Sequence, residues 1–168
     1  MSVSKGSICI FGCGNTLMGD DGIGSRVIKK LQSLSYECLE NVKIEDIGIC
    51  NLGLLNMIKN ADKVIIIDSV ITGSEKGSII RIDGSELLKT NHDPNPAFSM
   101  HEISLSDVLL AGSYIQKLPE IVVFGIEVGE NTNELSSQIS SKVLEAVDRI
   151  IPLIIEEMKI EENTQIFE

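Results

Sequence analysis

The feature that most limits the possible folds is a glycine-rich stretch that directly follows an apolar run. Residues 8–11 read Ile-Cys-Ile-Phe, and residues 12–24 read Gly-Cys-Gly-Asn-Thr-Leu-Met-Gly-Asp-Asp-Gly-Ile-Gly. A β-branched and aromatic run that ends in a glycine-studded turn is typical of a strand-loop-helix unit. The sequence therefore predicts an α/β domain whose first strand leads through this loop into a helix.

Loops of this kind often bind phosphate, but the spacing excludes the two common versions. The dinucleotide-binding pattern needs a third glycine where this chain has Leu17. The phosphate loop needs Lys and Ser or Thr where this chain has Asp20 and Asp21. Two carboxylates at the start of a helix repel phosphate and suit a cation. We expect one of them to cap the helix and the other to be free for binding, although the pattern also allows a merely structural turn.

Length and charge narrow the classes of protein. The 168 residues fit a single domain over residues 1–168, and the net charge of -11 argues against nucleic acid or anionic membrane as partners. No apolar run approaches the roughly 18 to 20 residues of a membrane span. The first residues lack the apolar core of a signal peptide, so we expect a cytoplasmic protein.

The four cysteines do not form a recognisable metal or redox motif. They stand without any Cys-x-x-Cys pair, which disfavours a zinc ribbon or a thioredoxin-like site. Cys9 and Cys13 fall on the same face of the first strand, where we expect both to be small buried apolar residues.

Hydrophobic periodicity predicts the remaining elements. Val64 to Ile67 form a continuous β-branched run that ends at Asp68, which is typical of a central strand covered on both faces. Only a short polar link separates this strand from the next one, so we expect the two to pair as an antiparallel hairpin. The predicted fold is a three-layer α/β sandwich with an about five-stranded, mostly parallel twisted sheet and helices on both faces. The expected strands cover residues 7–13, 42–47, 64–67, 77–83 and 121–126.

Four helices are expected around this sheet. Ser104 and Asp107 resemble a capping box that opens one of them, and Pro152 should kink the last. A long irregular loop with one short helical turn at residues 85–89 is expected over residues 84–100, and the tail after about residue 160 should fray. The last helix is expected over residues 134–158, and the remaining two over residues 22–34 and 52–59.

Three polar groups can meet at one edge of this sheet. Ligands bind such sheets outside the carboxyl ends of the strands. Asp20 and Asp21 follow the first strand, Asp68 ends the central strand, and a loop crossing the same edge can bring His101 to them. Carboxylate oxygens and an imidazole form a mixed ligand set that suits a divalent transition ion with coordination positions left open.

Other catalytic sites are excluded by spacing. His101 and Glu102 begin like a zinc protease helix, but Leu105 stands where the second histidine is required. No Gly-x-Ser-x-Gly nucleophile elbow is present. Asp68 lacks the second aspartate of a phosphatase site, because Val70 occupies that position. Nucleophilic catalysis and phosphoryl transfer are therefore unsupported.

Three segments resemble the endopeptidases that mature nickel-iron hydrogenases by cutting a C-terminal peptide from the large-subunit precursor. Residues 12–24 resemble the opening motif of this family, and residues 65–68 (Ile-Ile-Ile-Asp) resemble its central strand. Residues 99–101 (Ser-Met-His), ahead of residues 105–108 (Leu-Ser-Asp-Val), resemble its histidine segment. The resemblance covers roughly residues 7–150, and it implies a doubly wound sheet between helices.

The resemblance also implies a site and a mechanism. The nickel-contacting and catalytic trio of the family maps onto Asp21, Asp68 and His101. The nickel belongs to the precursor and serves as the recognition element, so no permanently bound cofactor is expected. The group that activates water stays open between a metal-polarised carbonyl and a carboxylate base, Asp21 or Asp68.

One segment departs from the family pattern, and a second hypothesis stays open. Ile49-Cys50-Asn51 stands where the family commonly has Thr and Gly, a departure that bears on substrate choice more than on metal contact. A flavodoxin-like module that binds a metal or small ligand without proteolytic activity is the alternative. Nickel retention by the isolated protein, without cleavage of a precursor, would favour that alternative.

Overall fold

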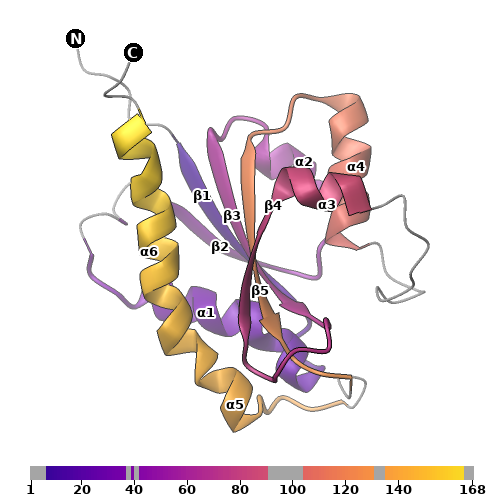
Figure 1. Ribbon diagram of the computed structural model, residues 1–168, viewed down its shortest axis with the longest axis vertical. Coiled ribbons are helices and arrows are strands. Elements are labelled where there is room, and N and C mark those ends of the chain that lie inside the picture. Colours follow the sequence, from indigo (N-terminus) through magenta and orange to yellow (C-terminus); the bar gives the residue numbers. More distant parts are fainter. Residues whose placement is uncertain (1–6, 37–38, 40–41, 91–103, 131–134, 165–168) are drawn as a thin grey trace.

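The computed structural model describes residues 7–36, 39, 42–90, 104–130 and 135–164 (Figure 1). Its strands are β1 (Ile8–Cys13), β2 (Lys43–Gly48), β3 (Lys63–Val70), β4 (Ile79–Asp83) and β5 (Glu120–Glu127). They form a sheet in the order β2-β1-β3-β5-β4, in which the first four run parallel and β4 runs antiparallel to β5. The prediction of an α/β domain with a mostly parallel sheet of five strands is confirmed.

The expected hairpin is wrong in its pairing partner. β4 runs antiparallel as predicted, but it pairs with β5, which lies between β4 and β3. β5 is buried at every residue except Glu120, whereas β4 is only partly buried and carries Arg81 and Asp83. The more apolar strand therefore occupies the interior of the sheet, and the more polar strand lies at the edge, where its charged side chains reach solvent.

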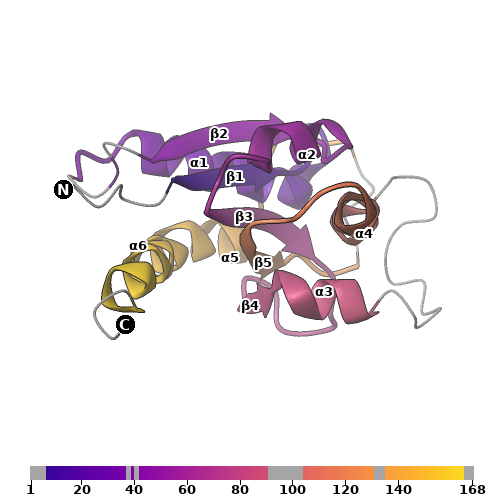
Figure 2. The same ribbon diagram turned by 90° about the horizontal axis from the view of Figure 1, so that it is seen from above.

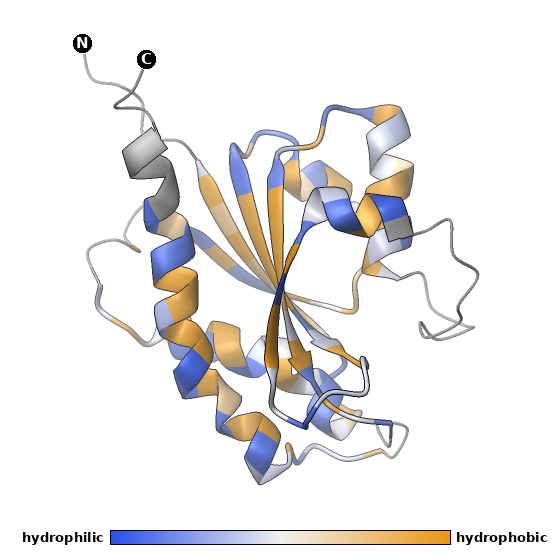
Figure 3. Ribbon diagram, in the orientation of Figure 1, coloured by the Kyte–Doolittle hydropathy of each residue, from blue (hydrophilic) through white to orange (hydrophobic). Residues whose placement is uncertain are grey.

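Helices cover both faces of the sheet, as the two views show (Figures 1 and 2). They are α1 (Ile23–Gln32), α2 (Gly53–Ile58), α3 (Gly84–Thr90), α4 (Leu105–Ile115), α5 (Ser141–Leu144) and α6 (Ala146–Thr164). One apolar core joins α1 and α6 to Ile10 and Ile65, and a second joins α2 and α4 to Phe11 and Ile66. Neighbouring strand residues serve opposite cores because side chains alternate between the faces of a sheet. Hydropathy colouring shows the apolar residues concentrated in β1, β3 and β5 (Figure 3).

The helix boundaries differ from the predictions at the C-terminal end. The helix expected over residues 134–158 begins at Ser141 and is divided into α5 and α6 at Glu145. Ser136 cannot start it, because its carbonyl accepts from the N–H of Gly19 at 2.6 Å and its N–H donates to the carbonyl of Leu17 at 2.9 Å. Pro152 lies inside α6, and the helix continues to Thr164. The chain was expected to leave the helix at about residue 160, so this prediction is wrong.

Three other boundaries can be compared with the predictions. The capping box is confirmed, because the Ser104 hydroxyl accepts from the N–H of Asp107 at 3.1 Å and Asp107 accepts from the N–H of Ser104 at 3.1 Å. The single turn expected at residues 85–89 extends to the whole of α3. β3 does not end at Asp68 but continues to Val70, because β5 remains paired with it as far as Glu127.

β1 and α1 approach each other closely at two glycines. A Cβ atom on Gly24 would lie 2.1 Å from the carbonyl oxygen of Cys13 and 2.7 Å from that of Ile67. A Cβ atom on Gly12 would lie 2.4 Å from the Ile28 side chain. Helix-to-strand contact, the role of the third glycine in dinucleotide-binding loops, is thus performed by Gly24 here. The glycine-rich loop is consequently held against the carboxyl ends of β1 and β3.

Candidate active site

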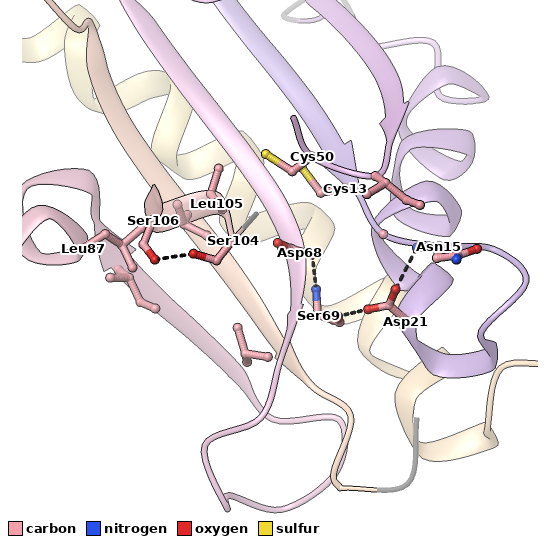
Figure 4. Close-up of a pocket in the computed structure, with 15 residues that line it drawn as sticks. Cys13, Asn15, Asp21, Cys50, Asp68, Ser69, Leu87, Ser104, Leu105 and Ser106 are labelled. Atoms are coloured by element: carbon pink, nitrogen blue, oxygen red, sulfur yellow. Dashed lines mark hydrogen bonds between the residues drawn. The ribbon is translucent and has the colours of Figure 1, made fainter. Parts of the chain in front are cut away.

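A cavity of about 180 Å³ lies at the carboxyl ends of the parallel strands (Figure 4). The strand order changes direction between β1 and β3, since the chain passes from β1 to β2 on one side and to β3 on the other. Open α/β sheets bind ligands at such a switch point. The polar and thiol side chains that line the cavity are those of Cys13, Asn15, Asp21, Cys50, Asp68, Ser69, Ser104 and Ser106.

Asp21 is placed by the turn that follows β1. Gly14 has φ of 134°, and a Cβ atom there would lie 1.9 Å from the carbonyl oxygen of Asp21, so the turn requires glycine. The N–H of Asn15 donates to Asp21 Oδ2 at 2.8 Å. A 3-10 turn over Gly19–Gly22 then carries the chain into α1. The tight turn therefore fixes the carboxylate at the cavity instead of at the start of the helix.

Asp68 lies on β3 with its side chain toward the α4 face, in line with Val64 and Ile66. Burial raises the pKa of this carboxyl to about 7, against the opposing effect of the Ser69 N–H, which donates to Asp68 Oδ1 at 2.8 Å. The negative charge of Asp21 raises it further. A carboxyl with a pKa near neutrality is able to take up or release a proton at physiological pH.

Ser69 connects the two carboxylates. Its hydroxyl donates a short hydrogen bond to Asp21 Oδ1, while its backbone N–H donates to Asp68. The residue adjoins Asp68 at the carboxyl end of the central strand, and this position is the signal by which the sequence could have indicated it. Sequence reasoning missed Ser69 because β3 was expected to end one residue earlier.

The expectation that either Asp20 or Asp21 caps α1 is wrong. Gly22 is the N-cap residue of α1, and no side chain caps the helix. Asp20 is 8% exposed and accepts from the N–H of Ser140 at 2.5 Å, and it forms an ion pair with Lys76 at 2.7 Å. Burial opposes its ionisation, but the contacts with Lys76 and Ser140 together lower the pKa of Asp20. Both aspartates lie in the 3-10 turn that precedes α1, so neither occupies the N-cap position. Asp20 instead connects the glycine-rich loop to the segments that contain Lys76 and Ser140.

His101 lies outside the described residues. The start of α4, at Ser104, Leu105 and Ser106, does line the cavity. Within the described part of the chain, no three His, Cys, Asp or Glu side chains are grouped closely enough to hold a metal ion. The structure therefore brings together two of the three predicted ligands, Asp21 and Asp68, and their metal-binding role stays a prediction.

Two thiols form one wall of the cavity. Cys13 is 1% exposed, as the sequence predicted, and Cys9 is also buried. A hydrogen bond to Cys50, together with burial, raises the pKa of the Cys13 thiol, and the same hydrogen bond lowers the pKa of Cys50. The sequence contained no motif for this pair, because the two cysteines are 37 positions apart.

Described residues of the chain include no helix with the length and apolar composition needed to cross a membrane.

Comparison with known sequences gives a family for this fold and cavity. A family model described as hydrogenase maturation protease matches residues 25–157. A protein of Methanocaldococcus jannaschii whose name assigns it provisionally to the hydrogenase maturation proteases is 33% identical over 163 residues. That match covers 94% of this chain and 99% of the relative.

Solved structures agree with the sequence comparison. The hydrogenase maturating endopeptidase HybD from Escherichia coli superposes with a TM-score of 0.76 at 22% identity, and 92% of this chain and 93% of that chain are covered. The nickel-iron hydrogenase maturation protease HycI from Thermococcus kodakarensis gives a TM-score of 0.69 at 26% identity, with 93% and 94% covered. The chain belongs to the hydrogenase maturation protease family, and it is a peptidase of that family.

Proposed function

We propose that this peptidase removes a C-terminal peptide from the large-subunit precursor of a nickel-iron hydrogenase, and that nickel already held by the precursor is its recognition element. The observation that supports the proposal most strongly is the placement of Asp21 and Asp68. They come from different segments of the chain, yet both line one cavity at the carboxyl ends of β1 and β3. Here nickel is part of the substrate, and the peptidase carries no metal of its own.

The donor chemistry fits this proposal. Carboxylate oxygens from Asp21 and Asp68 and the imidazole of His101 would supply three ligands to an ion whose remaining ligands are thiolates of the precursor. His101 stands three residues before Ser104, which lines the cavity. A precursor without nickel would lose these contacts, so the peptidase would distinguish the two forms by differential affinity.

Asp68 has a second possible role. Its pKa of about 7 matches that of a general base that accepts a proton from water near neutral pH. Polarisation of the scissile carbonyl by the nickel of the precursor is the competing way to activate the reaction. The general-base mechanism and the nickel-polarisation mechanism differ in pH dependence. Only the general-base mechanism requires an ionised Asp68 that is not already bound to metal.

Exposed apolar side chains next to the cavity suit a protein substrate. Ile49 lines the cavity and is 48% exposed, while Ile71 follows the lining residue Val70 and is 40% exposed. Leu17, close to Asn15, is 64% exposed. Exposed apolar side chains of this kind are typical of a surface that binds another protein. A cytoplasmic location, where both the precursor and reduced thiols are found, completes the proposal.

The decisive experiment compares nickel-loaded and nickel-free precursor as substrates, with cleavage followed by mass spectrometry. We expect cleavage of the loaded form alone. His101→Ala should abolish cleavage, and His92→Ala is the matched control, because it removes the other histidine of the chain. Equal cleavage of both precursors, or full activity of His101→Ala, would contradict the nickel mechanism. Tight nickel retention by the isolated protein without any cleavage would instead favour the binding-module alternative.

A further inference from the structure

Two cysteines that the proposed function does not use lie side by side in the cavity wall (Figure 4). Cys13 is the last residue of β1, and its register partner in β2 is Gly48. The N–H of Gly14 donates to the carbonyl of Gly48 at 3.0 Å, which holds the two strand ends together. Cys50 follows two residues after Gly48, and the two thiols are within hydrogen-bond contact.

The two thiols differ in access. Cys13 is 1% exposed, whereas Cys50 is partly exposed and belongs to the segment that leads from β2 to α2. Cys9, which lies on the same face of β1, pairs with Lys43 at the other end of the strand and does not line the cavity. A reagent that enters the cavity therefore meets Cys50 first, and Cys13 is the thiol placed to react next.

We propose that Cys13 and Cys50 are a reversible dithiol site that closes to an intramolecular disulfide by exchange with a small-molecule disulfide such as oxidised glutathione. In the first step, the Cys50 sulfur attacks the small disulfide, forms a mixed disulfide and releases one small thiol. In the second step, the Cys13 sulfur attacks the Cys50 sulfur and releases the second small thiol. The two protein thiols lose their protons to the two leaving thiolates, and the small disulfide is reduced as the protein is oxidised.

The disulfide would change the cavity in which Asp68 lies. An S–S bond of about 2.05 Å is much shorter than a thiol hydrogen bond. Closing it draws the segment at Ile49 and Cys50 toward the end of β1, and both residues line the cavity. This consequence rests on the proposed function: if the cavity receives the metal site of the precursor, oxidation of the pair lowers precursor cleavage, and a reductant restores it.

The disulfide is tested directly, without an activity assay. The protein is incubated with oxidised glutathione, quenched with an alkylating reagent, digested with trypsin and analysed by tandem mass spectrometry. Cys13 lies on the tryptic peptide 6–26 together with Cys9, and Cys50 lies on peptide 44–59. We expect these two peptides to be linked through Cys13, with Cys9 alkylated, and the link to disappear after reduction. Stable glutathione on Cys50, a link to Cys9, or no link at all would overturn the proposal.

Two variants sharpen the test. Cys9→Ala leaves Cys13 as the sole thiol of its peptide and should still form the link. Cys50→Ser should leave Cys13 unlinked, and Cys13→Ala should trap glutathione on Cys50. In the cleavage assay, the ratio of rates with and without oxidised glutathione should fall in the wild type and stay near one in Cys50→Ser. A link that forms without a change in this ratio would refute the proposed consequence for the cavity while the dithiol site stands. A precursor that is never cleaved would refute the proposed function alone.

Discussion

Asp21 and Asp68 are connected through a single residue, Ser69, whose hydroxyl donates to one carboxylate and whose backbone N–H donates to the other. Asp21 comes from the loop after β1, and Asp68 comes from β3. The hydrogen bonds of Ser69 hold two like charges at one cavity, where repulsion would otherwise separate them.

Replacing Ser69 with alanine tests this link. Ser69→Ala removes the hydroxyl that Asp21 accepts and leaves the backbone contact with Asp68 intact. Hydrogen bonds to charged groups contribute about 1.5–3 kcal/mol, so we expect kcat/KM for the nickel-loaded precursor to fall roughly tenfold to a hundredfold. Ser69→Thr keeps a hydroxyl and should recover most of the loss. The idea fails if both variants lose activity equally, or if Ser69→Ala loses activity only through unfolding, as measured by its Tm.

Substitutions of the two adjacent aspartates should have different effects, on stability for Asp20 and on cleavage for Asp21. Asp20→Asn breaks the ion pair with Lys76, and because Lys76 is partly exposed we expect a loss of about 2 kcal/mol in the free energy of unfolding. Asp21→Asn should have a smaller effect on unfolding and should nearly abolish cleavage. Urea denaturation and the precursor assay on both variants measure the two effects. The reverse assignment, with Asp20 essential for cleavage and Asp21 needed only for stability, would contradict the site.

The raised pKa of Asp68 predicts a pH-dependent effect on stability. A carboxyl whose folded-state pKa is about 7, above an unfolded value of about 3.9, stabilises the fold when protonated. That contribution is complete below about pH 4 and is lost as the pH rises to about 7. Asp68→Asn stays neutral, so its Tm should exceed that of the wild type at pH 8 by more than it does at pH 5. A difference in Tm that does not change with pH would show that Asp68 ionises normally.

Lys63 should matter for stability and not for catalysis. It is completely buried at the start of β3, five residues from Asp68, and pairs with Glu157 at 2.9 Å and Glu120 at 3.0 Å. Lys63→Met leaves Glu157 buried with Arg81 as its remaining partner, so we expect a loss of about 2 kcal/mol in the free energy of unfolding. Lys142→Met, which breaks an exposed pair with Glu75, is the control and should cost less than about 0.5 kcal/mol. At a temperature where Lys63→Met is still folded, its rate of precursor cleavage should equal that of the wild type. A reduced rate under these conditions would contradict a purely structural role for Lys63.

Several elements could be predicted because their causes are local. The apolar run of β1 predicted the first strand, and the β-branched run of β3 predicted a central strand. The capping box at Ser104 predicted the start of α4. The family resemblance of three short segments also predicted the peptidase, which the comparisons confirmed. These features depend on residues close together in the chain.

Other features depend on contacts between distant residues. The pairing of β4 with β5 follows from competition between strands for the interior of the sheet, which no single segment reveals. The role of Asp20 depends on Lys76 and Ser140, 56 and 120 positions away. Local rules assigned one of the two aspartates to a helix cap because Asp is a common N-cap residue, and the tertiary contacts prevailed.

The sequence by itself thus determined the α/β class, the glycine-rich turn and the placement of Asp21 and Asp68 near the carboxyl ends of the first and central strands. Only the tertiary structure decided that Asp21 faces the cavity while Asp20 fastens the loop, that Ser69 links the two carboxylates, and that Cys13 meets Cys50. The physical reason is that backbone conformation and burial follow largely from neighbouring residues, whereas the partner of a polar side chain is set by packing of the whole sheet and its helices.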